Sequence, residues 1–486
     1  MKHNKKLVRI IAIVLVVLLA GSVVVGALFA AMAEEVPVRN QCELTMTYLE
    51  DQQALHVEQR LLYYNRTASR LDRVVFYAAP NMLRRESALM YENDDLERVF
   101  FAGYAPGGID LRIVTVDSEA ADHGFQGEDE LYLRVACDLA PGERATFEFD
   151  YYILLPVCGA FVGAGPEDVR LGAFCFIPGV FDGDLMLKKP LPFTRWLHAD
   201  AMDYRASLTL PEGWMAASTG EQADAAIIAE GAREFALAFG KRWRLTERRT
   251  ASGVAVRVFS GRRDAGRAAD MAVRAIGHCE DWFGSFPLRE LDIAQSDYPL
   301  GALNYPGLTL VSNALMEDRD ALEKALRFCV AQQIFGMAAY VEPSADAWLS
   351  DSICEYLAYL MLEADSGRDA FLKAVNRDWV SALQFTVPGG LRVTSDASLF
   401  DSKSYDTVVR KRGAVVFHEL RNAMGLEDLL AGLSEFAHMG RDGHTLTEME
   451  LVRALDAATG GSWEDFLTDW VFNVDDYVEQ RIDLYD

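Results

Sequence analysis

The residues that could do chemistry in this 486-residue sequence lie mostly in its second half. A zinc-binding helix needs two imidazoles four residues apart, with a carboxylate beside the first as general base. Only half of that pattern occurs, at His418 and Glu419, because Asn422 stands where the second imidazole would be. One metal ligand makes no site, so we interpret His418 and Glu419 as structural residues on a surface turn of a helix.

Two other groups could support catalysis. Cys329 could act as a nucleophile with His278 or His418 as its base. Asp351 and Glu355, four residues apart, could form an acid–base pair of carboxylates. A buried small side chain explains the cysteine more simply, and the polar face of a helix explains the carboxylates. We therefore assign catalysis to neither group.

The elements that would position these residues follow from the hydrophobic periodicity. From about residue 40 to 250, apolar and polar residues alternate between Pro-Gly turns, which predicts strands. From about residue 260 the apolar residues recur every three or four positions, which predicts helices. The clearest strands are 73–79, 131–137, 146–154, 291–294 and 308–311, and the helices are 268–283, 322–335, 348–362, 370–383 and 413–424. The sequence predicts an α+β protein, with a β domain followed by a mostly α domain.

Three local patterns add detail. Asp320, with Glu323 three residues later, predicts an N-terminal capping box. The acidic residues 117–130 predict a solvated loop. A basic cluster is expected on the exposed face of an edge strand rather than at a docking site; it comprises Lys241, Arg242, Arg244, Arg248 and Arg249.

Four segments of the second half resemble, in order and at family spacing, the gluzincin zinc aminopeptidases of the membrane alanyl aminopeptidase type. Residues 301–307 read GALNYPG, similar to GAMENPG; residues 328–336 read FCVAQQIFG, similar to HELAHQWFG; residues 348–352 read WLSDS, similar to WLNEG; and residues 410–414 read RKRGA, similar to YxKGA. The end of the chain, 462–470, also resembles the end of that family's catalytic domain. The resemblance implies a β saddle domain at 36–255, then a thermolysin-like, mainly α domain at 256–486.

The resemblance also implies what has been lost. In this family two imidazoles and a carboxylate bind zinc, a glutamate activates the zinc-bound water, and a tyrosine stabilises the oxyanion. The glutamate of GAMEN binds the α-amine of the substrate. The matching positions hold Phe328 and Gln332 for the imidazoles, Cys329 for the general base, Asp351 for the carboxylate ligand, Arg410 for the tyrosine and Asn304 for the amine-binding glutamate. Zinc is expected for the family, but its ligands are missing here, so no cofactor is predicted.

The same resemblance indicates where a ligand would bind. The family's GAMENPG loop borders an edge strand that pairs with the substrate backbone, and such hydrogen bonds do not need zinc. The expected substrate-cleft residues are Gly301, Ala302, Leu303, Asn304 and Tyr305. We further expect Arg410, or else Arg412, to pair with Asp351 and replace the lost metal charge.

The first 33 residues predict a membrane anchor. Residues 10–33 form an uncharged run behind a basic tail, 1–9. Roughly 20 apolar residues span a bilayer, and a basic flank stays cytoplasmic. A cleaved signal peptide is the alternative, because AMA at 31–33 resembles a cleavage site, although signal cores usually run about 7–15 residues. Either way, we expect residues from about 36 onward to be extracytoplasmic, and the anchored form to be a single-pass membrane protein.

The charge and the cysteine pattern exclude some classes of partner and metal site. Lys and Arg number 47 against 73 Asp and Glu, giving a net charge of −26. Such a surface repels phosphate backbones, so no nucleic acid partner is expected. The 7 cysteines include no CxxC pair, which excludes a zinc ribbon or a thioredoxin-like site. One or two disulfides remain possible, and a bridge between Cys329 and Cys354 is one candidate.

Together these features predict a membrane-anchored pseudo-aminopeptidase that binds a peptide or protein in the former substrate cleft without hydrolysing it. An active metallopeptidase with an atypical metal site is the first alternative. A structural module of the cell envelope is the second.

Overall fold

The computed structural model describes residues 39–86, 91, 93–127, 129–182, 184–262, 264–440 and 444–471. The predicted membrane span at 10–33 and the basic tail lie outside these residues. No helix within the described ranges is long and apolar enough to cross a membrane.

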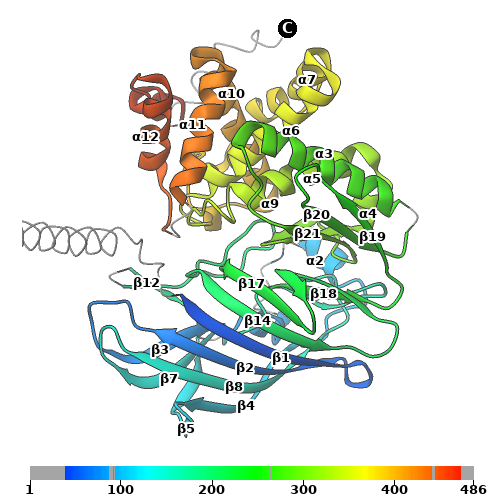
Figure 1. Ribbon diagram of the computed structural model, residues 1–486, viewed down its shortest axis with the longest axis vertical. Helices are drawn as coiled ribbons and strands as arrows, with labels where there is room; N and C mark the ends of the chain where they lie inside the picture. Colours follow the sequence, from blue (N-terminus) through cyan, green and yellow to red (C-terminus); the bar gives the residue numbers. More distant parts are fainter. Residues whose placement is uncertain are drawn as a thin grey trace, which may run out of the picture. The chain divides into compact units, whose positions relative to one another are not determined.

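A large twisted sheet dominates the first half of the chain (Figure 1). In β1 every second side chain is buried and the others face outward, as expected for a strand with one solvated face. In sheet order its strands are β16 (Glu221–Ala223), β17 (Ala226–Ala232), β14 (Met202–Thr209), β1 (Asn40–Leu49), β2 (Ala54–Tyr64), β8 (Arg144–Leu154), β4 (Gly108–Val116) and β5 (Glu119–Ala120). All neighbours are antiparallel except β1 and β14.

Smaller sheets complete the β-rich part. One contains β15 (Met215–Ser218), β18 (Leu237–Gly240), β10 (Val169–Leu171) and β9 (Val162–Ala164); another contains β11 (Ile177–Pro178), β3 (Leu71–Tyr77), β7 (Tyr132–Leu139) and β6 (His123–Gln126); β12 (Val180–Asp182) pairs with β13 (Asp184–Met186). The predicted loop at 117–130 is therefore partly wrong. It contains β5 and β6, whose residues are mostly exposed, because each strand adds to the edge of a sheet.

A five-stranded sheet opens the second half of the described chain. In order its strands are β19 (Arg244–Arg249), β20 (Ala255–Ser260), β21 (Glu290–Ser296), β23 (Leu308–Ser312) and β22 (Ala302–Tyr305). The two edge strands differ in their exposure to solvent. β19 is almost wholly exposed, which confirms the edge-strand prediction for Arg244, Arg248 and Arg249, whereas Lys241 and Arg242 precede the strand. β22 forms the other edge and is half-buried.

Helices make up the rest. They are α2 (Asn93–Val99), α3 (Ala265–Phe283), α4 (Asn313–Glu317), α5 (Arg319–Ile334), α6 (Ala347–Ser366), α7 (Arg368–Val375), α8 (Ser381–Leu383), α9 (Ser402–Tyr405), α10 (Gly413–Met424), α11 (Leu426–Met439) and α12 (Glu448–Thr459). Within residues 40–486, Figure 1 shows α3, α5, α6, α10 and α11 gathered on one side and the large sheet on the other. The predicted α+β order, a β-rich part followed by a helical part, is confirmed.

Two helix predictions need correction. The N-cap of α5 is Asp318, whose carboxylate accepts hydrogen bonds from the backbone N–H groups of Asp320 and Ala321. Asp320 lies inside the first turn instead, because Asp318 is the last residue with extended backbone. The single helix predicted at 370–383 is α7 and α8 joined by a π-helical segment, Asn376–Val380. A second π-helical segment, Asp406–Arg412, leads into α10.

Candidate functional site

A cavity of about 380 Å³ lies where the β-rich part meets α5, α6 and β22. The loop at 191–197 contributes one wall, and β22 with α5 contributes another. The predicted site residues Phe328, Cys329, Gln332, Asp351 and Arg410 all line it, together with the predicted cleft residues Gly301 to Tyr305. The structure therefore brings together residues that the sequence spreads over more than a hundred positions.

Arg410 lies over the ring of Phe328 in the cavity. The guanidinium carbon is 3.9 Å from the centre of the Phe328 ring, which is cation–π geometry. Phe328 is held there by α5, and Arg410 by the π-helical segment that precedes α10. Phe328, which holds an imidazole position of the resemblance, thus contacts Arg410, which holds its tyrosine position.

The charge partner of Arg410 is Glu355, not Asp351. Arg410 Nη2 lies 3.1 Å from Glu355 Oε2, and Arg410 Nη1 lies 3.5 Å from Asp406 Oδ1. Lys324 Nζ reaches the other oxygen of Glu355 at 2.9 Å. Burial alone would lower the pKa of Arg410, but the carboxylates of Glu355 and Asp406 raise it above its ordinary value. The expected Arg410–Asp351 pair is therefore wrong, and Arg412 binds the backbone oxygen of Ala382 instead.

Neutral donors satisfy Asp351. Gln332 Nε2 donates to Asp351 Oδ1 at 2.8 Å, Tyr405 Oη donates to Oδ2 at 2.9 Å, and Thr194 Oγ1 donates to Oδ2 at 3.2 Å. Burial and the neighbouring Asp351 raise the pKa of Tyr405 well above its ordinary value, so the phenol stays protonated and donates. A buried carboxylate with three such donors needs no ion-pair partner, which is why Arg410 is free to bind Glu355.

Asn304 ties β22 to α5. Its amide nitrogen donates to the Cys329 carbonyl at 3.0 Å and to Gln332 Oε1 at 3.1 Å. Its amide oxygen accepts from Thr309 Oγ1 at 2.6 Å and from Gln333 Nε2 at 3.0 Å. Both donors and both acceptor positions are used within the protein. Where the resemblance places an amine-binding glutamate, this chain has a structural brace.

The backbone of β22 presents a free edge to the cavity. Gly301 accepts a hydrogen bond from the Ser312 N–H, and β22 pairs antiparallel with β23. Because hydrogen-bonded and non-hydrogen-bonded pairs alternate, the backbone groups of Leu303 and Tyr305 also point toward β23. Those of Ala302 and Asn304 point the other way. The edge strand can therefore pair with one more extended chain.

The side chains where the resemblance places a zinc ion do not fit that metal. Zinc is held by imidazoles, thiolates and carboxylates in tetrahedral sets of three or four. The described residues lining the cavity include no histidine, and Asp351 is already saturated by hydrogen bonds. Burial raises the pKa of the Cys329 thiol to about 12, so it is not a thiolate near neutral pH. Arg410 brings a fixed cation to the same cavity, which opposes a second one.

The other candidates from the sequence lie elsewhere. His418 and Glu419 are buried on α10 rather than on a surface turn, and burial lowers the pKa of His418 to about 4. Asp351 and Glu355 are buried too, so they do not form a wet polar face. All 7 cysteines are unpaired, including Cys329.

Several residues that shape this site had no sequence signal. Tyr405 and Thr194 belong to no motif, and only the fold brings them to Asp351. Glu355 carried a weak signal, since it lies one turn after Asp351 on the same helix. Lys324 carried none.

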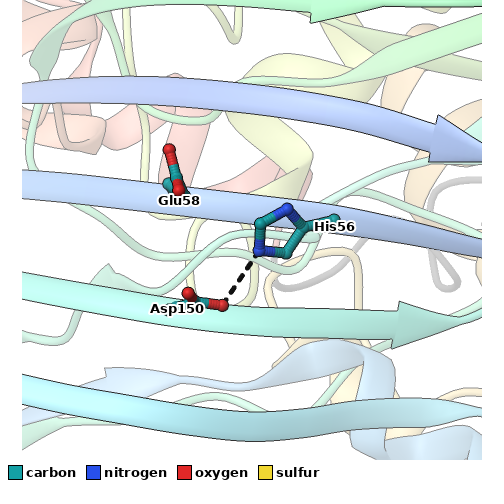
Figure 2. Close-up of side chains that lie close together, drawn as sticks. All are labelled: His56, Glu58 and Asp150. Carbon is teal, nitrogen blue, oxygen red and sulfur yellow. Dashed lines mark hydrogen bonds and ion pairs between the residues drawn. The ribbon is translucent and has the colours of Figure 1, made fainter.

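A second group of titratable side chains lies on the outer face of the large sheet. His56 and Glu58 on β2 and Asp150 on β8 have ligand atoms within 4.8 Å of one another (Figure 2). His56 Nε2 is hydrogen-bonded to Asp150 Oδ1 at 2.9 Å, and its ring stacks on Tyr152. The group is partly exposed to solvent, and it matters below as a second place where added metal could bind.

Comparisons with known proteins agree with the fold and the motifs. No family model matches the chain. Two curated relatives are Aminopeptidase M1-B of Oryza sativa subsp. japonica, 27% identical over 251 residues, and Aminopeptidase N of Lactococcus lactis subsp. lactis (strain IL1403), 26% identical over 249 residues. Each match covers 46% of this chain but only 27% and 29% of the relatives. The chain therefore matches less than a third of their length.

A solved structure matches more of the chain. An M1 zinc metallopeptidase mutant from Deinococcus radiodurans aligns with a TM-score of 0.60 and 18% identity, covering 89% of this chain and 93% of that one. At that identity the match shows the fold. The relatives show that part of the chain is similar to aminopeptidases, and the structural neighbour shows a peptidase-like fold.

Proposed function

We propose that this chain is a pseudo-aminopeptidase that binds a peptide along β22 and does not hydrolyse it. The observation that carries the proposal is the rebuilt cavity floor. Arg410, stacked on Phe328 and paired with Glu355, lies where catalysis in the family needs a metal site and a tyrosine. We interpret the β-rich part as the saddle domain and the helical part as the thermolysin-like domain of that family.

The free edge of β22 supports binding. Its outward backbone groups at Ala302 and Asn304 remain available, and neither depends on zinc. Asn304 fixes the strand to α5 through its side chain, so the edge is held in place before a ligand arrives. A rigid edge lowers the entropy lost on binding.

Metal content and hydrolysis test the proposal. Purified full-length chain is expected to contain well under one zinc per molecule and to show no increase in Tm with added Zn²⁺, because linkage requires a site on the folded state. No amine should be released from a panel of aminoacyl reporter substrates. A His56→Ala variant is measured in parallel, because it removes the imidazole from the possible metal-binding group on the outer sheet face. Metal that this variant still binds is then bound at another place.

The opposite result is specific. Stoichiometric zinc that survives dialysis in the His56→Ala variant, and is lost on Asp351→Asn, would establish a metal site in the cavity and overturn the proposal. Reporter hydrolysis that is abolished by Asp351→Asn would do the same.

We also propose that residues 10–33 anchor the chain, with the bulk of it outside the cytoplasm. The basic tail at 1–9 should stay inside because of the positive-inside rule. Protease added to intact spheroplasts is expected to digest the part of the chain beyond about residue 36. Full protection, with digestion only after lysis, would show the reverse orientation.

A further inference from the structure

One carboxylate of the cavity takes no part in the network at its floor. Glu234 lies in the loop between β17 and β18 and is half-buried in the cavity wall. It accepts a hydrogen bond from the backbone N–H of Ala173. No Lys or Arg nitrogen of the described residues lies within 4.0 Å of its carboxylate, so it has no ion pair there.

The cations of the cavity are committed to other groups. Lys324 pairs with Glu355, and Lys411 pairs with Asp406 at 2.5 Å. Burial raises the pKa of Glu234, and Arg195 is the cation that partly lowers it. Its terminal nitrogens, however, donate hydrogen bonds to the Gly336 carbonyl and to Ser350 Oγ. Glu234 is therefore left with a negative charge that the protein does not fully balance.

Electrostatics agree with that geometry. Burial raises the pKa of the Glu234 carboxyl to about 7, and Arg195 and the Ala173 N–H only partly offset this. A cation bound beside the carboxylate would compensate for the hydration that Glu234 loses on burial. The protein alone leaves this group short of one positive partner.

Two tyrosines line the same cavity. Tyr298 and Tyr305 line the cavity, and the Tyr298 hydroxyl donates to the Pro192 carbonyl, which fixes its ring. Tyr305 packs under the backbone of Gly172 so closely that a Cβ there would lie 2.2 Å from the Tyr305 hydroxyl. Burial, and after it the charge of the Glu234 carboxylate, raise the pKa of Tyr305, so this phenol lies near that carboxylate. An aromatic ring near a carboxylate favours an ammonium or guanidinium group over a neutral one.

We propose that Glu234 receives the cationic side chain, lysine or arginine, of a peptide bound along β22. This inference rests on the proposed function, and it adds the chemical class of the ligand. A chain paired with β22 projects alternate side chains to opposite sides, so one set can reach the wall at Glu234 while the backbone stays on the strand edge. Asn304 has spent its hydrogen bonds within the protein, which leaves Glu234 as the acceptor for a cation.

The test uses the purified full-length chain and fluorescein-labelled, N-acetylated hexapeptides of alternating alanine and valine. One position at a time carries arginine or its neutral isostere citrulline, and affinity is read by fluorescence anisotropy. Acetylation removes the terminal amine, so any preference belongs to the side chain. At one or more positions the arginine peptide should bind about tenfold more tightly than its citrulline partner, as expected for a charge-assisted hydrogen bond.

Glu234→Gln should abolish that preference while leaving citrulline-peptide affinity within about twofold, since it removes charge but little volume. Glu58→Gln, a carboxylate on the outer sheet face, is the matched control and should keep the preference. Equal binding of both peptides by the natural chain would overturn the inference and leave the proposed function standing. If none of these peptides binds, both are overturned.

Discussion

Arg410→Ala is expected to lower the free energy of unfolding by about 2–3 kcal/mol, because it leaves a fully buried carboxylate with less than its normal compensation. The Glu355 side chain is 0% exposed, and after the change only Lys324, whose side chain is 34% exposed, remains beside it. This cost lies just below the roughly 3–5 kcal/mol of a fully buried broken pair, since the Arg410 side chain is itself 26% exposed. Loss of the stacking on Phe328 adds to the cost.

Urea unfolding of single and double variants measures the pairing directly. Arg410→Ala and Glu355→Gln should show a coupling energy above about 1 kcal/mol, whereas Arg410→Ala and Asp351→Asn should add within about 0.5 kcal/mol. Arg248→Ala serves as control, since its pair with Asp270 is exposed and should change stability by less than about 0.5 kcal/mol. Additive effects at Arg410 and Glu355 would show that the contact contributes nothing and that the floor is held in some other way.

The sequence predicts the elements of this fold well because their signals are local. The apolar spacing of 268–283 and 413–424 corresponds to α3 and α10, and the alternation at 146–154 to β8. The π-helical segments at Asn376–Val380 and Asp406–Arg412 were not predicted. Their apolar spacing resembles that of an α-helix, and a hydrogen bond that spans five residues instead of four leaves no mark on the pattern.

The partner of Arg410 was mispredicted for a different reason. Asp351 and Glu355 lie one turn apart on α6, and both are carboxylates within reach of the same floor. The choice depends on which of them already has donors. Thr194, which satisfies Asp351, comes from a loop 157 positions earlier in the chain, and no local pattern reveals such a contact. The residue types at the positions that resemble the family's motifs could be read from the sequence, but the hydrogen-bond network around them could not.

Ala302→Pro is expected to weaken peptide binding by at least about tenfold, because it removes a donor at the free edge of β22 and adds a ring there. The Ala302 N–H points away from β23, so the ladder between the two strands loses no hydrogen bond. Proline is tolerated at such a position on an edge strand, and the Tm should change little. The measurement is fluorescence anisotropy with the acetylated alanine–valine hexapeptides, beside a thermal unfolding curve of each variant.

Two further variants separate the lost donor from a damaged strand. Ala302→Gly keeps the backbone N–H and should retain affinity within about threefold, since it removes only a methyl group. Leu303→Pro removes an N–H that points toward β23, so it should lower both stability and affinity. Undiminished binding by a well-folded Ala302→Pro variant would show that the ligand does not pair with β22, and the cavity would then have to hold it by side-chain contacts alone.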